Sequence, residues 1–313
     1  MDIFDTKGIK PMLIAEQAEA FDNLDWLYEL KLDGIRCVAY LDPAGKTDLR
    51  NKRDKMLLPH LPELSDIHLQ VSQKCILDGE VFVLKNGITD FYEIQRRALL
   101  TDPFKIRLSA GKYPAAYVAF DILYYQDHLV TDLPLIERKK LLQEIVWENP
   151  QISVSRYIDS AGIDLYTLAA ERGLEGIVAK RRDSRYYFDK RTKDWIKCKI
   201  MTTDDCVICG YIHKANHMTS LVLGQYNGPD LVYRGHVTLG VSLRVLYEHH
   251  PKQICASPFG YIPPGNEEAV WLAPDLVCIV EYMPSDKSSF RQPVYRGIRN
   301  DKTAMECTVR PQE

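Results

Sequence analysis

Lys31 is a candidate nucleophile and lies within the stretch Glu29-Leu30-Lys31-Leu32-Asp33-Gly34-Ile35-Arg36. A lysine amine attacks only after losing its proton, so its ordinary pKa of about 10.4 must be lowered by burial or by a nearby cation. Arg36 is placed to supply positive charge and to bind a phosphate or a ribose. The alternative interpretation is a hairpin carrying an ordinary surface lysine, because short motifs match by chance.

Other carboxylates and cations occur within or next to apolar segments. Candidate metal-binding or nucleotide-binding carboxylates are Asp78, Glu80, Asp121 and Glu175, and candidate phosphate-binding cations are Arg36, Lys180, Lys197 and Lys199. Mg²⁺ is commonly bound by one or two carboxylates together with substrate phosphates, and Phe120 is suited to stack on a nucleobase. A lysine, a metal and a triphosphate together predict attack on the α-phosphate, which leaves a covalent lysine–nucleotide adduct and releases pyrophosphate.

The elements that must position these residues are predicted from apolar patterns. Strands are expected on both sides of Lys31, at Trp26-Leu27-Tyr28 and at Cys37 to Leu41, with Asp33-Gly34 as a tight turn. Cys75 to Leu84 is expected to form two strands joined at Asp78-Gly79. Helices are expected at 91–100, 135–147 and 163–172. After about residue 202, short strands with Gly and Pro turns favour a small barrel, so the predicted domains are 1–201 and 202–313.

The composition argues against several classes of protein. The chain has 313 residues, 46% of them hydrophobic, which suits two domains with substantial cores. No apolar run approaches the ~18 residues of a membrane-spanning helix, and the acidic start shows no signal-peptide pattern. Eight scattered cysteines favour a reducing cytoplasm over a disulfide framework. The net charge of −3 argues against nucleic-acid binding, but segment 180–199 is strongly basic.

Six groups of residues, taken in order, resemble the covalent nucleotidyltransferase superfamily. They are Lys31-Leu-Asp-Gly-Ile-Arg36, Asp78-Gly-Glu80, Phe120-Asp121, Glu175-Gly-Ile-Val-Ala-Lys180, Trp195-Ile-Lys197-Cys-Lys199 and Gln292-Pro293-Val-Tyr-Arg-Gly297-Ile-Arg299-Asn-Asp301-Lys302. Within the superfamily the chain looks most like the ATP-dependent DNA ligases, and among these like the ligase domain of the bacterial end-joining ligases, over about residues 10–305. The resemblance implies an α+β fold: a nucleotidyltransferase (adenylation) domain of antiparallel sheets with flanking helices, followed by an OB-fold β-barrel.

The resemblance also implies roles for individual residues. Lys31 matches the lysine that takes AMP, and Glu80 and Glu175 match the carboxylates that bind the ribose and the divalent metal. The nucleotide contacts match Glu29 for adenine, Arg36 for the ribose and 5′-phosphate, Phe120 for stacking, Lys197 and Lys199 for the α-phosphate, and Arg50 for nucleotide or DNA. Arg299, Asp301 and Lys302 match a motif of the second domain that orients the pyrophosphate leaving group. Leu49 and Lys52, which flank Arg50, depart from the family pattern. We therefore expect the geometry of that loop to differ from the geometry in the family.

The implied enzyme is an ATP-dependent DNA ligase that uses ATP as AMP donor with Mg²⁺ or Mn²⁺. No nicotinamide-binding module precedes Lys31, which favours ATP over NAD. The implied partners are nicked double-stranded DNA and a Ku-type end-binding protein, with no membrane, and the expected form is a cytoplasmic monomer. Two alternatives remain: an RNA ligase or capping guanylyltransferase, which share the lysine motif, and a non-catalytic subunit that binds DNA ends.

Some patterns have simpler structural interpretations. Cys206-x-x-Cys209 with His213 and His217 resembles a zinc pattern, but cysteines packed in a strand are favoured because no second pair follows. The segment Glu137-Arg138-Lys139-Lys140 is expected to be a solvated helix face. Asp121 is either a structural carboxylate or a neighbour of the nucleotide, and Trp195 is expected in the core.

Overall fold

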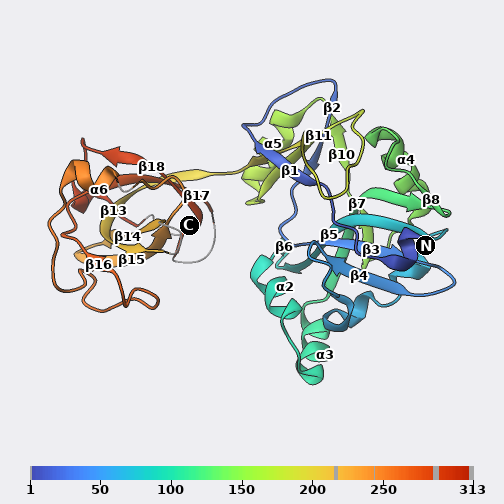
Figure 1. The fold of residues 1–313 in the computed structure, drawn as a ribbon, viewed down its shortest axis with the longest axis horizontal. Coiled ribbons are helices and arrows are strands. Elements are labelled where there is room, and N and C mark those ends of the chain that lie inside the picture. Colours follow the sequence, from blue (N-terminus) through green and yellow to red (C-terminus); the bar gives the residue numbers. More distant parts are fainter. Residues whose placement is uncertain (1, 215–217, 243, 285–288, 310–313) are drawn as a thin grey trace. The chain divides into compact units, whose positions relative to one another are not determined.

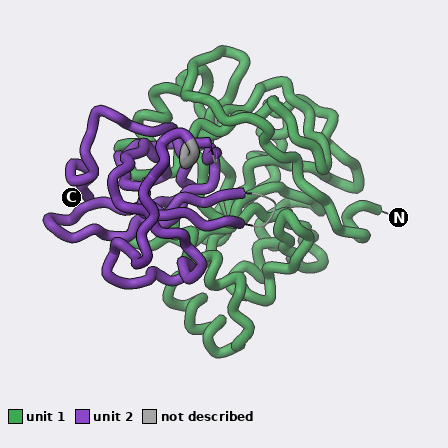
Figure 2. The backbone as a smooth tube through the Cα atoms, turned by 60° about the vertical axis from the view of Figure 1, so that its left-hand side comes forward, with its two compact units in different colours: residues 1–199 green, residues 200–313 purple. Residues whose placement is uncertain are grey.

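The structure is a computed structural model that describes residues 2–214, 218–242, 244–284 and 289–309. The chain divides into two compact units, residues 1–199 (unit 1) and 200–313 (unit 2), drawn in Figures 1 and 2. The sequence places the boundary two residues further on. No helix in the described residues is long and apolar enough to cross a membrane.

The helices of unit 1 are short and lie around two sheets (Figure 1). They are α1 (Ile3–Thr6), α2 (Phe91–Ala98), α3 (Pro103–Lys112), α4 (Leu135–Ile145) and α5 (Gly162–Glu171), with 3₁₀ turns at Leu58–His60, Pro62–Leu64 and Ile67–Gln70. Side chains define where two of them begin, because Asp90 caps α2 by accepting from the Glu93 amide and Asp102 caps α3 just before a proline. The predicted helices at 91–100, 135–147 and 163–172 are therefore confirmed, whereas α3 was missed.

One sheet of unit 1 has five strands in the order β1-β12-β11-β2-β10. Its members are β1 (Leu13–Gln17), β2 (Trp26–Leu30), β10 (Tyr157–Asp159), β11 (Gly176–Arg181) and β12 (Arg191–Lys199). The pairing of β1 with β12 is parallel, and the other pairs are antiparallel. Two neighbouring strands of this sheet carry predicted site residues. Glu29 lies in β2, directly before Lys31, and Lys180 lies in β11.

The other sheet of unit 1 has seven strands, with β4-β3-β5-β7-β8 in a row and β6 and β9 on its sides. Its members are β3 (Ile35–Leu41), β4 (Thr47–Asn51), β5 (Cys75–Lys85), β6 (Ile88–Thr89), β7 (Ala115–Tyr125), β8 (His128–Leu129) and β9 (Ile152–Val154). The expectation of two strands joined at Asp78-Gly79 is wrong, since both residues lie inside β5. Gly79 is needed there for close packing, because a Cβ would lie 2.5 Å from the Tyr117 ring and 2.4 Å from the Val118 carbonyl oxygen.

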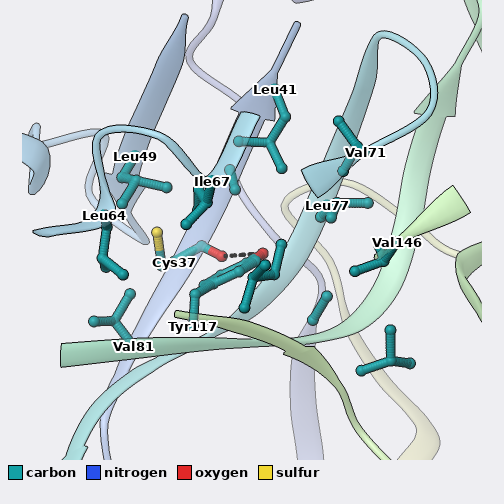
Figure 3. Close-up of a cluster of buried hydrophobic side chains, with 14 of the residues drawn as sticks. Cys37, Leu41, Leu49, Leu64, Ile67, Val71, Leu77, Val81, Tyr117 and Val146 are labelled. Carbon is teal, nitrogen blue, oxygen red and sulfur yellow. Dashed lines mark hydrogen bonds between the residues drawn. The ribbon is translucent and has the colours of Figure 1, made fainter. Parts of the chain in front are cut away.

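The largest core of unit 1 packs one face of this seven-stranded sheet against the 3₁₀ turns and helices. Figure 3 shows part of it, with Leu41, Leu77 and Val81 of the sheet beside Leu64 and Ile67 of the turns. The Tyr117 hydroxyl is satisfied inside this core, because it donates to the Cys37 carbonyl at 3.4 Å. Packing against the turns and helices thus holds the sheet on this face. Arg36, Glu80 and Phe120 of the same sheet line the cavity described below.

Unit 2 is a curled sheet in the order β15-β14-β13-β17-β18, with β16 added beside β13. Its elements are β13 (Thr202–His213), β14 (Thr219–Asn227), β15 (Asp230–Val237), α6 (Arg244–His249), β16 (Val270–Trp271), β17 (Val277–Met283), β18 (Arg291–Arg299) and a 3₁₀ turn at Ala304–Glu306. The outer strands β15 and β18 contact each other, and the Tyr295 amide of β18 donates to the Leu239 carbonyl just after β15. The curled sheet is the expected OB-fold barrel.

Candidate active site

A cavity of about 260 Å³ lies in unit 1 and receives side chains from both of its sheets. Seven residues predicted for nucleotide chemistry line it: Glu29, Lys31, Arg36, Glu80, Phe120, Lys180 and Lys197. The remaining lining residues are Leu13, Ile14, Leu30, Leu32, Lys52, Ser155, Val178, Arg191 and Trp195. The cavity thus combines an apolar wall with cations and two carboxylates, which suits a nucleotide.

Lys31 lies in the crossover between the two sheets, directly after β2 and before β3. These strands do not pair with each other, so the alternative of a simple hairpin is wrong. The Lys31 amide donates to the Gly176 carbonyl at 2.9 Å, and the Lys31 Nζ donates to Glu175 Oε2 at 2.6 Å. Gly34 allows the crossover, because a Cβ there would lie 2.3 Å from the Val81 carbonyl oxygen. Both the backbone and the amine of the lysine are therefore fixed.

Glu29 is buried in a group of positive and hydroxyl donors. Its Oε1 lies 2.6 Å from Lys139 Nζ and 2.9 Å from Lys180 Nζ, and its Oε2 accepts from the Ser155 hydroxyl at 2.6 Å. Burial by itself raises the pKa of Glu29, but the two ammonium groups and Ser155 outweigh burial, and the net pKa is lowered. Glu29 therefore remains a carboxylate at the wall of the cavity.

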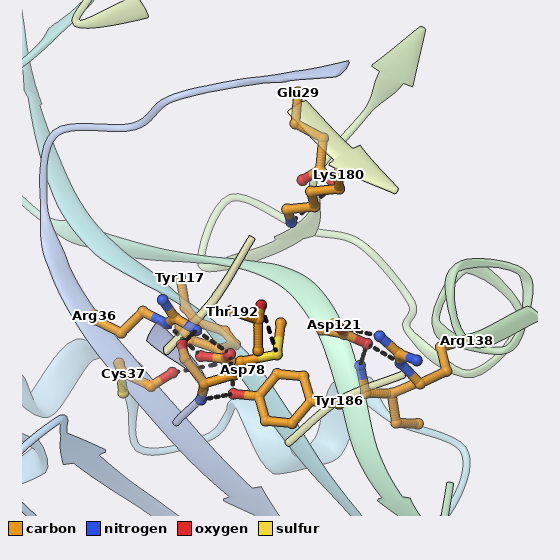
Figure 4. Close-up of polar contacts among 12 residues, drawn as sticks. Glu29, Arg36, Cys37, Asp78, Tyr117, Asp121, Arg138, Lys180, Tyr186 and Thr192 are labelled. Carbon is orange, nitrogen blue, oxygen red and sulfur yellow. Dashed lines mark hydrogen bonds and ion pairs between the residues drawn. The ribbon is translucent and has the colours of Figure 1, made fainter. Parts of the chain in front are cut away.

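Arg36 is held in place by a buried aspartate. The Arg36 Nε and Nη2 donate to the two oxygens of Asp78 at 2.7 and 2.5 Å, and Nη2 also donates to the Met12 carbonyl at 3.0 Å (Figure 4). The Tyr186 hydroxyl donates to Asp78 Oδ2 at 2.6 Å. Burial opposes the charge of Arg36, but Asp78 raises its pKa, so the guanidinium stays charged. Asp78 is thus the residue that orients Arg36, a role that sequence reasoning missed.

Asp121 is a structural carboxylate. It is completely buried and accepts two hydrogen bonds from Arg138, at 2.7 and 2.8 Å, as Figure 4 shows. The prediction of a solvated helix face at 137–140 is wrong for Arg138 and Lys139, which are both fully buried. Their charges are offset by carboxylates of distant strands, Asp121 of β7 and Glu29 of β2, and a local helical pattern carries no sign of such partners.

Aromatic rings form one wall of the cavity around Lys180. The Lys180 Nζ lies 4.4 Å from the centroid of the Phe120 ring and 4.2 Å from that of Trp195. The Phe120 and Trp195 rings meet edge to face with centroids 6.0 Å apart. Trp195 is 1% exposed, so it belongs to the core as expected, although its ring also lines the cavity. Burial lowers the pKa of Lys180 to about 8.

Glu80 and Lys197 set the electrostatics of the side of the cavity near Lys31. Burial raises the pKa of Glu80 to about 8, with Lys31 and Arg36 opposing the increase and Asp78 and Glu175 adding to it. Burial lowers the pKa of Lys197, and the charge of Lys31 adds to the decrease. Glu80 has no hydrogen-bond or ion-pair partner among the described residues. The carboxyl group of this half-buried residue, which lines the cavity, is thus available for a cation or a hydroxyl group.

Besides Asp78 and Asp121, three further predicted residues of unit 1 do not line the cavity. Glu175 is 5% exposed and reaches it through its ion pair with Lys31. Arg50 is held on the β4 side by Asp48, at 3.0 Å, and by Asp54, at 3.1 Å. Lys199 ends β12, two residues beyond Lys197, and is absent from the cavity lining. Lys52 and Arg191, which were not singled out as site residues, do line it.

The predicted residues of unit 2 gather on one aspartate. Arg299 donates to Asp301 at 2.9 Å and to Asp205 at 2.8 Å, and Lys302 donates to Asp205 at 2.6 Å. Burial opposes the charge of Asp205, but the hydrogen bonds from Lys302 and Arg299 lower its pKa. Asp205 lies on β13, far from the motif in sequence, and nothing in the pattern of residues pointed to it.

The zinc pattern in unit 2 is not supported within the described residues. Cys206 and Cys209 are both buried and belong to different hydrophobic clusters. No group of three or more His, Cys, Asp or Glu among the described residues is placed to hold a metal ion. His217 lies outside the described residues. The interpretation as packed cysteines is consistent with this arrangement.

Comparison with known proteins identifies relatives for both units. Residues 11–199 match the family described as "ATP dependent DNA ligase domain", and residues 214–302 match "ATP dependent DNA ligase C terminal region". The "Multifunctional non-homologous end joining protein LigD" of Pseudomonas aeruginosa is 33% identical over 305 residues, which cover 91% of this chain and 34% of that protein. "DNA ligase C" of Mycobacterium tuberculosis is 30% identical over 338 residues, covering 96% of this chain and 92% of that protein. The chain spans about a third of the length of the first of these relatives.

Solved structures agree. A structure described as "mycobacterial DNA ligase D complexed with ATP and MES" has a TM-score of 0.57 at 26% identity, covering 99% of this chain and 100% of that chain. The ligase domain of LigD from M. tuberculosis has a TM-score of 0.55 at 25% identity, with coverage of 99% and 100%. The matches to both units and the cavity built around Lys31 lead to one conclusion: the chain belongs to the family of ATP-dependent DNA ligases.

Proposed function

We propose that this chain seals nicks in double-stranded DNA in three steps. The Lys31 amine attacks the α-phosphate of ATP, forms a P–N bond and releases pyrophosphate. AMP then passes from Lys31 to a DNA 5′-phosphate, and the adjacent 3′-hydroxyl displaces AMP to form the phosphodiester bond. The observation that carries this proposal is the position of Lys31, whose side chain is 21% exposed and borders a cavity suited to a nucleotide.

Residues of the chain meet the other requirements of this attack, which are an oriented nucleotide, neutralised phosphate charge and removal of the amine proton. Phe120 offers a face for the base, and Arg36, fixed by Asp78, is placed for the ribose or a phosphate. Lys197 brings a second cation beside Lys31. Glu175 Oε2, 2.6 Å from the amine, is placed to receive the proton.

A divalent cation, Mg²⁺ or Mn²⁺, fits the carboxylates of this site. Glu80 is a half-buried residue of the cavity lining whose pKa is raised to about 8 by burial, so a cation beside it would stabilise the charged form. Glu80 and Glu175 would hold the ion together with substrate phosphates, the kind of site that Mg²⁺ prefers. When bound, such an ion would neutralise negative charge on the phosphates of ATP during attack on the α-phosphate.

The named relatives support a proposal for the biological setting. Because the multifunctional LigD proteins are named for non-homologous end joining, we infer that this chain joins broken DNA ends, in cooperation with a Ku-type end-binding protein. We further propose that it acts as a monomer in the cytoplasm. Eight free cysteines, seven of them buried, suit a reducing compartment.

The test is labelling with ATP that carries a marker at the α-phosphate. Wild type, Lys31→Ala and the exposed-lysine control Lys85→Ala are first treated with pyrophosphate to remove any AMP, then incubated with Mg²⁺ and labelled ATP and denatured. Label is expected on wild type and on Lys85→Ala and is expected to be absent from Lys31→Ala. Addition of nicked DNA is expected to remove the label and to give sealed product.

Other outcomes identify the alternative functions. Label from GTP instead of ATP would favour a capping guanylyltransferase, and sealing of nicked RNA but not nicked DNA would favour an RNA ligase. No label on wild type after pyrophosphate treatment would overturn the proposal and leave a DNA-end-binding subunit as the better interpretation.

A further inference from the structure

Lys139 is a completely buried lysine on α4 that the mechanism above does not use. Its ammonium lies 2.6 Å from Glu29 Oε1. A buried ammonium is costly unless a carboxylate compensates it, so this contact is the reason that Lys139 points inward. The next residue, Lys140, belongs to the same helix and is exposed. One helix therefore presents two adjacent lysines in opposite environments.

The partners of Glu29 differ in whether they line the cavity. Lys180 and Ser155 line the cavity together with Glu29, whereas Lys139 does not. Figure 4 shows Glu29 and Lys180 next to each other. A carboxylate has about four acceptor positions. Ser155 donates a hydrogen bond to Oε2, whereas the ammonium groups of Lys139 and Lys180 form ion pairs with Oε1 and no hydrogen bond to it, so Glu29 keeps acceptor capacity for a ligand.

We propose that Lys139 is a positioning residue for purine selection: from behind the cavity wall it holds Glu29 ionised and oriented, so that Glu29 presents a hydrogen-bond acceptor to the base. The adenine 6-amino group is a donor and matches that acceptor, whereas the guanine 6-carbonyl oxygen is an acceptor and is repelled. This inference rests on the proposed use of ATP and adds a residue that never touches the nucleotide.

Removal of the Lys139 charge is expected to weaken this selection. Lys180 would then be the lone ammonium on Glu29, and the carboxylate would be free to rotate toward it and away from the base. The loss of one hydrogen bond to a charged acceptor corresponds to roughly 10- to 100-fold in binding. The expected result is a rise in KM for ATP of that size, little change in kcat and a fall in the preference for ATP over GTP.

The test compares Lys139→Met with the matched control Lys140→Met, which removes an exposed lysine one position along the same helix. Adenylylation is measured with ATP and with GTP, and binding of both nucleotides is measured by calorimetry in a Lys31→Ala background, where no adduct forms. Lys140→Met is expected to behave as wild type. Lys139→Met is expected to lose selectivity in both measurements.

A merely structural role gives a different result. If Lys139→Met melts at a lower temperature but keeps the wild-type ratio of ATP to GTP binding, the inference is wrong. If Lys139→Met does not fold, Lys139→Gln replaces it, because glutamine removes the charge while keeping a polar side chain; unchanged selectivity in that variant would equally overturn the inference. Failure of the proposed function is distinct, since wild type itself would then form no adenylate.

Discussion

The Nζ of Lys31 lies 2.6 Å from Oε2 of Glu175, across 144 positions of sequence. Lys31 follows β2, and Glu175 precedes β11, the antiparallel neighbour of β2. The pairing of these two strands therefore sets the distance between the amine and the carboxylate. The sequence contains both residues, but their relationship exists only in the folded sheet.

Glu175→Gln is expected to slow adenylylation of Lys31. Glutamine keeps the size of the side chain but carries no charge, so it can neither pair with the ammonium nor accept its proton. The single-turnover rate of labelling by ATP is expected to fall about 100-fold or more. Glu144→Gln on the exposed side of α4 is the matched control, and a Glu175→Gln rate within threefold of wild type would contradict this role.

Asp78→Asn is expected to destabilise unit 1. Asp78 is completely buried and balances the charge of Arg36, so the substitution leaves a half-buried guanidinium without its opposite charge, although the hydrogen bond to the Met12 carbonyl remains. Breaking one side of such a pair costs about 3–5 kcal/mol. Chemical denaturation monitored by tryptophan fluorescence measures this loss. An Asp78→Asn protein as stable as wild type would show that Arg36 finds another partner.

Glu80→Gln is expected to weaken the response of adenylylation to Mg²⁺. Glu80 is the carboxyl group of the cavity that has no partner among the described residues, so its substitution should alter the metal requirement more than the fold. The Mg²⁺ concentration for half-maximal adenylylation is expected to rise about tenfold or more, because a carboxylate ligand is lost. Circular dichroism checks the fold. An unchanged Mg²⁺ titration would place the ion elsewhere.

Asp205→Asn is expected to slow adenylylation of Lys31 but not the sealing of DNA that already carries a 5′-AMP. Asp205 contacts both Arg299 and Lys302, and its loss should allow these cations to move apart. If they orient pyrophosphate, adenylylation of Lys31 slows by about tenfold, a typical effect of lost positioning. Sealing of DNA that already carries a 5′-AMP should proceed at the wild-type rate. Equal losses in both reactions would argue for general damage to the barrel.

ATP affinity is expected to fall as pH rises above about 8, because the pKa of Lys180 is about 8 and Glu29 then loses one ammonium partner. Lys180 is faced by Glu29, Lys139 and Asp121, and the Lys139 charge contributes to the low pKa. In Lys139→Met the fall in affinity should therefore move to higher pH. ATP binding to Lys31→Ala variants across pH 6–10 measures it, and an identical pH dependence with and without Lys139 would contradict the assignment.

The same titration has a defined effect on stability. A lysine with a folded pKa of about 8 and an ordinary value of 10.5 binds fewer protons in the folded state than in the unfolded state between those values. The free energy of unfolding of wild type, compared with Lys180→Met, should therefore increase as pH rises from about 8 toward 10.5. A decrease over that window would show that burial of Lys180 does not lower its pKa.

Seven residues of the cavity could be predicted from sequence, but their supporting partners could not. Lys31, Glu29, Arg36, Glu80, Phe120, Lys180 and Lys197 meet in one cavity, because each of them sits at the end of, or inside, a strand of the two sheets. Asp78-Gly79 misled the prediction because this dipeptide is typical of turns. Here its glycine serves close packing against Tyr117, a contact between strands that local sequence does not encode.

Arg138, Lys139 and Asp205 could not be assigned for a related reason. A charged side chain is expected in water unless an opposite charge is available inside, and the compensating residues lie far away in sequence. The local periodicity of apolar residues therefore predicts helix α4 correctly, but it wrongly places Arg138 and Lys139 in solvent. Knowledge of which strands pair would have been needed to place these three residues.

The parallel pairing of β1 with β12 has a consequence for the synthesis of the protein. Leu13 and Ile14 of β1 line the cavity, yet their partners on β12 begin at Arg191. On the ribosome the amino-terminal strand must wait until the chain has grown past that point, and contacts between such distant segments form slowly. A nascent chain thus has no nucleotide pocket until nearly all of unit 1 has been made. Capture of ATP and charging of Lys31 should consequently be late events that report completion of the fold.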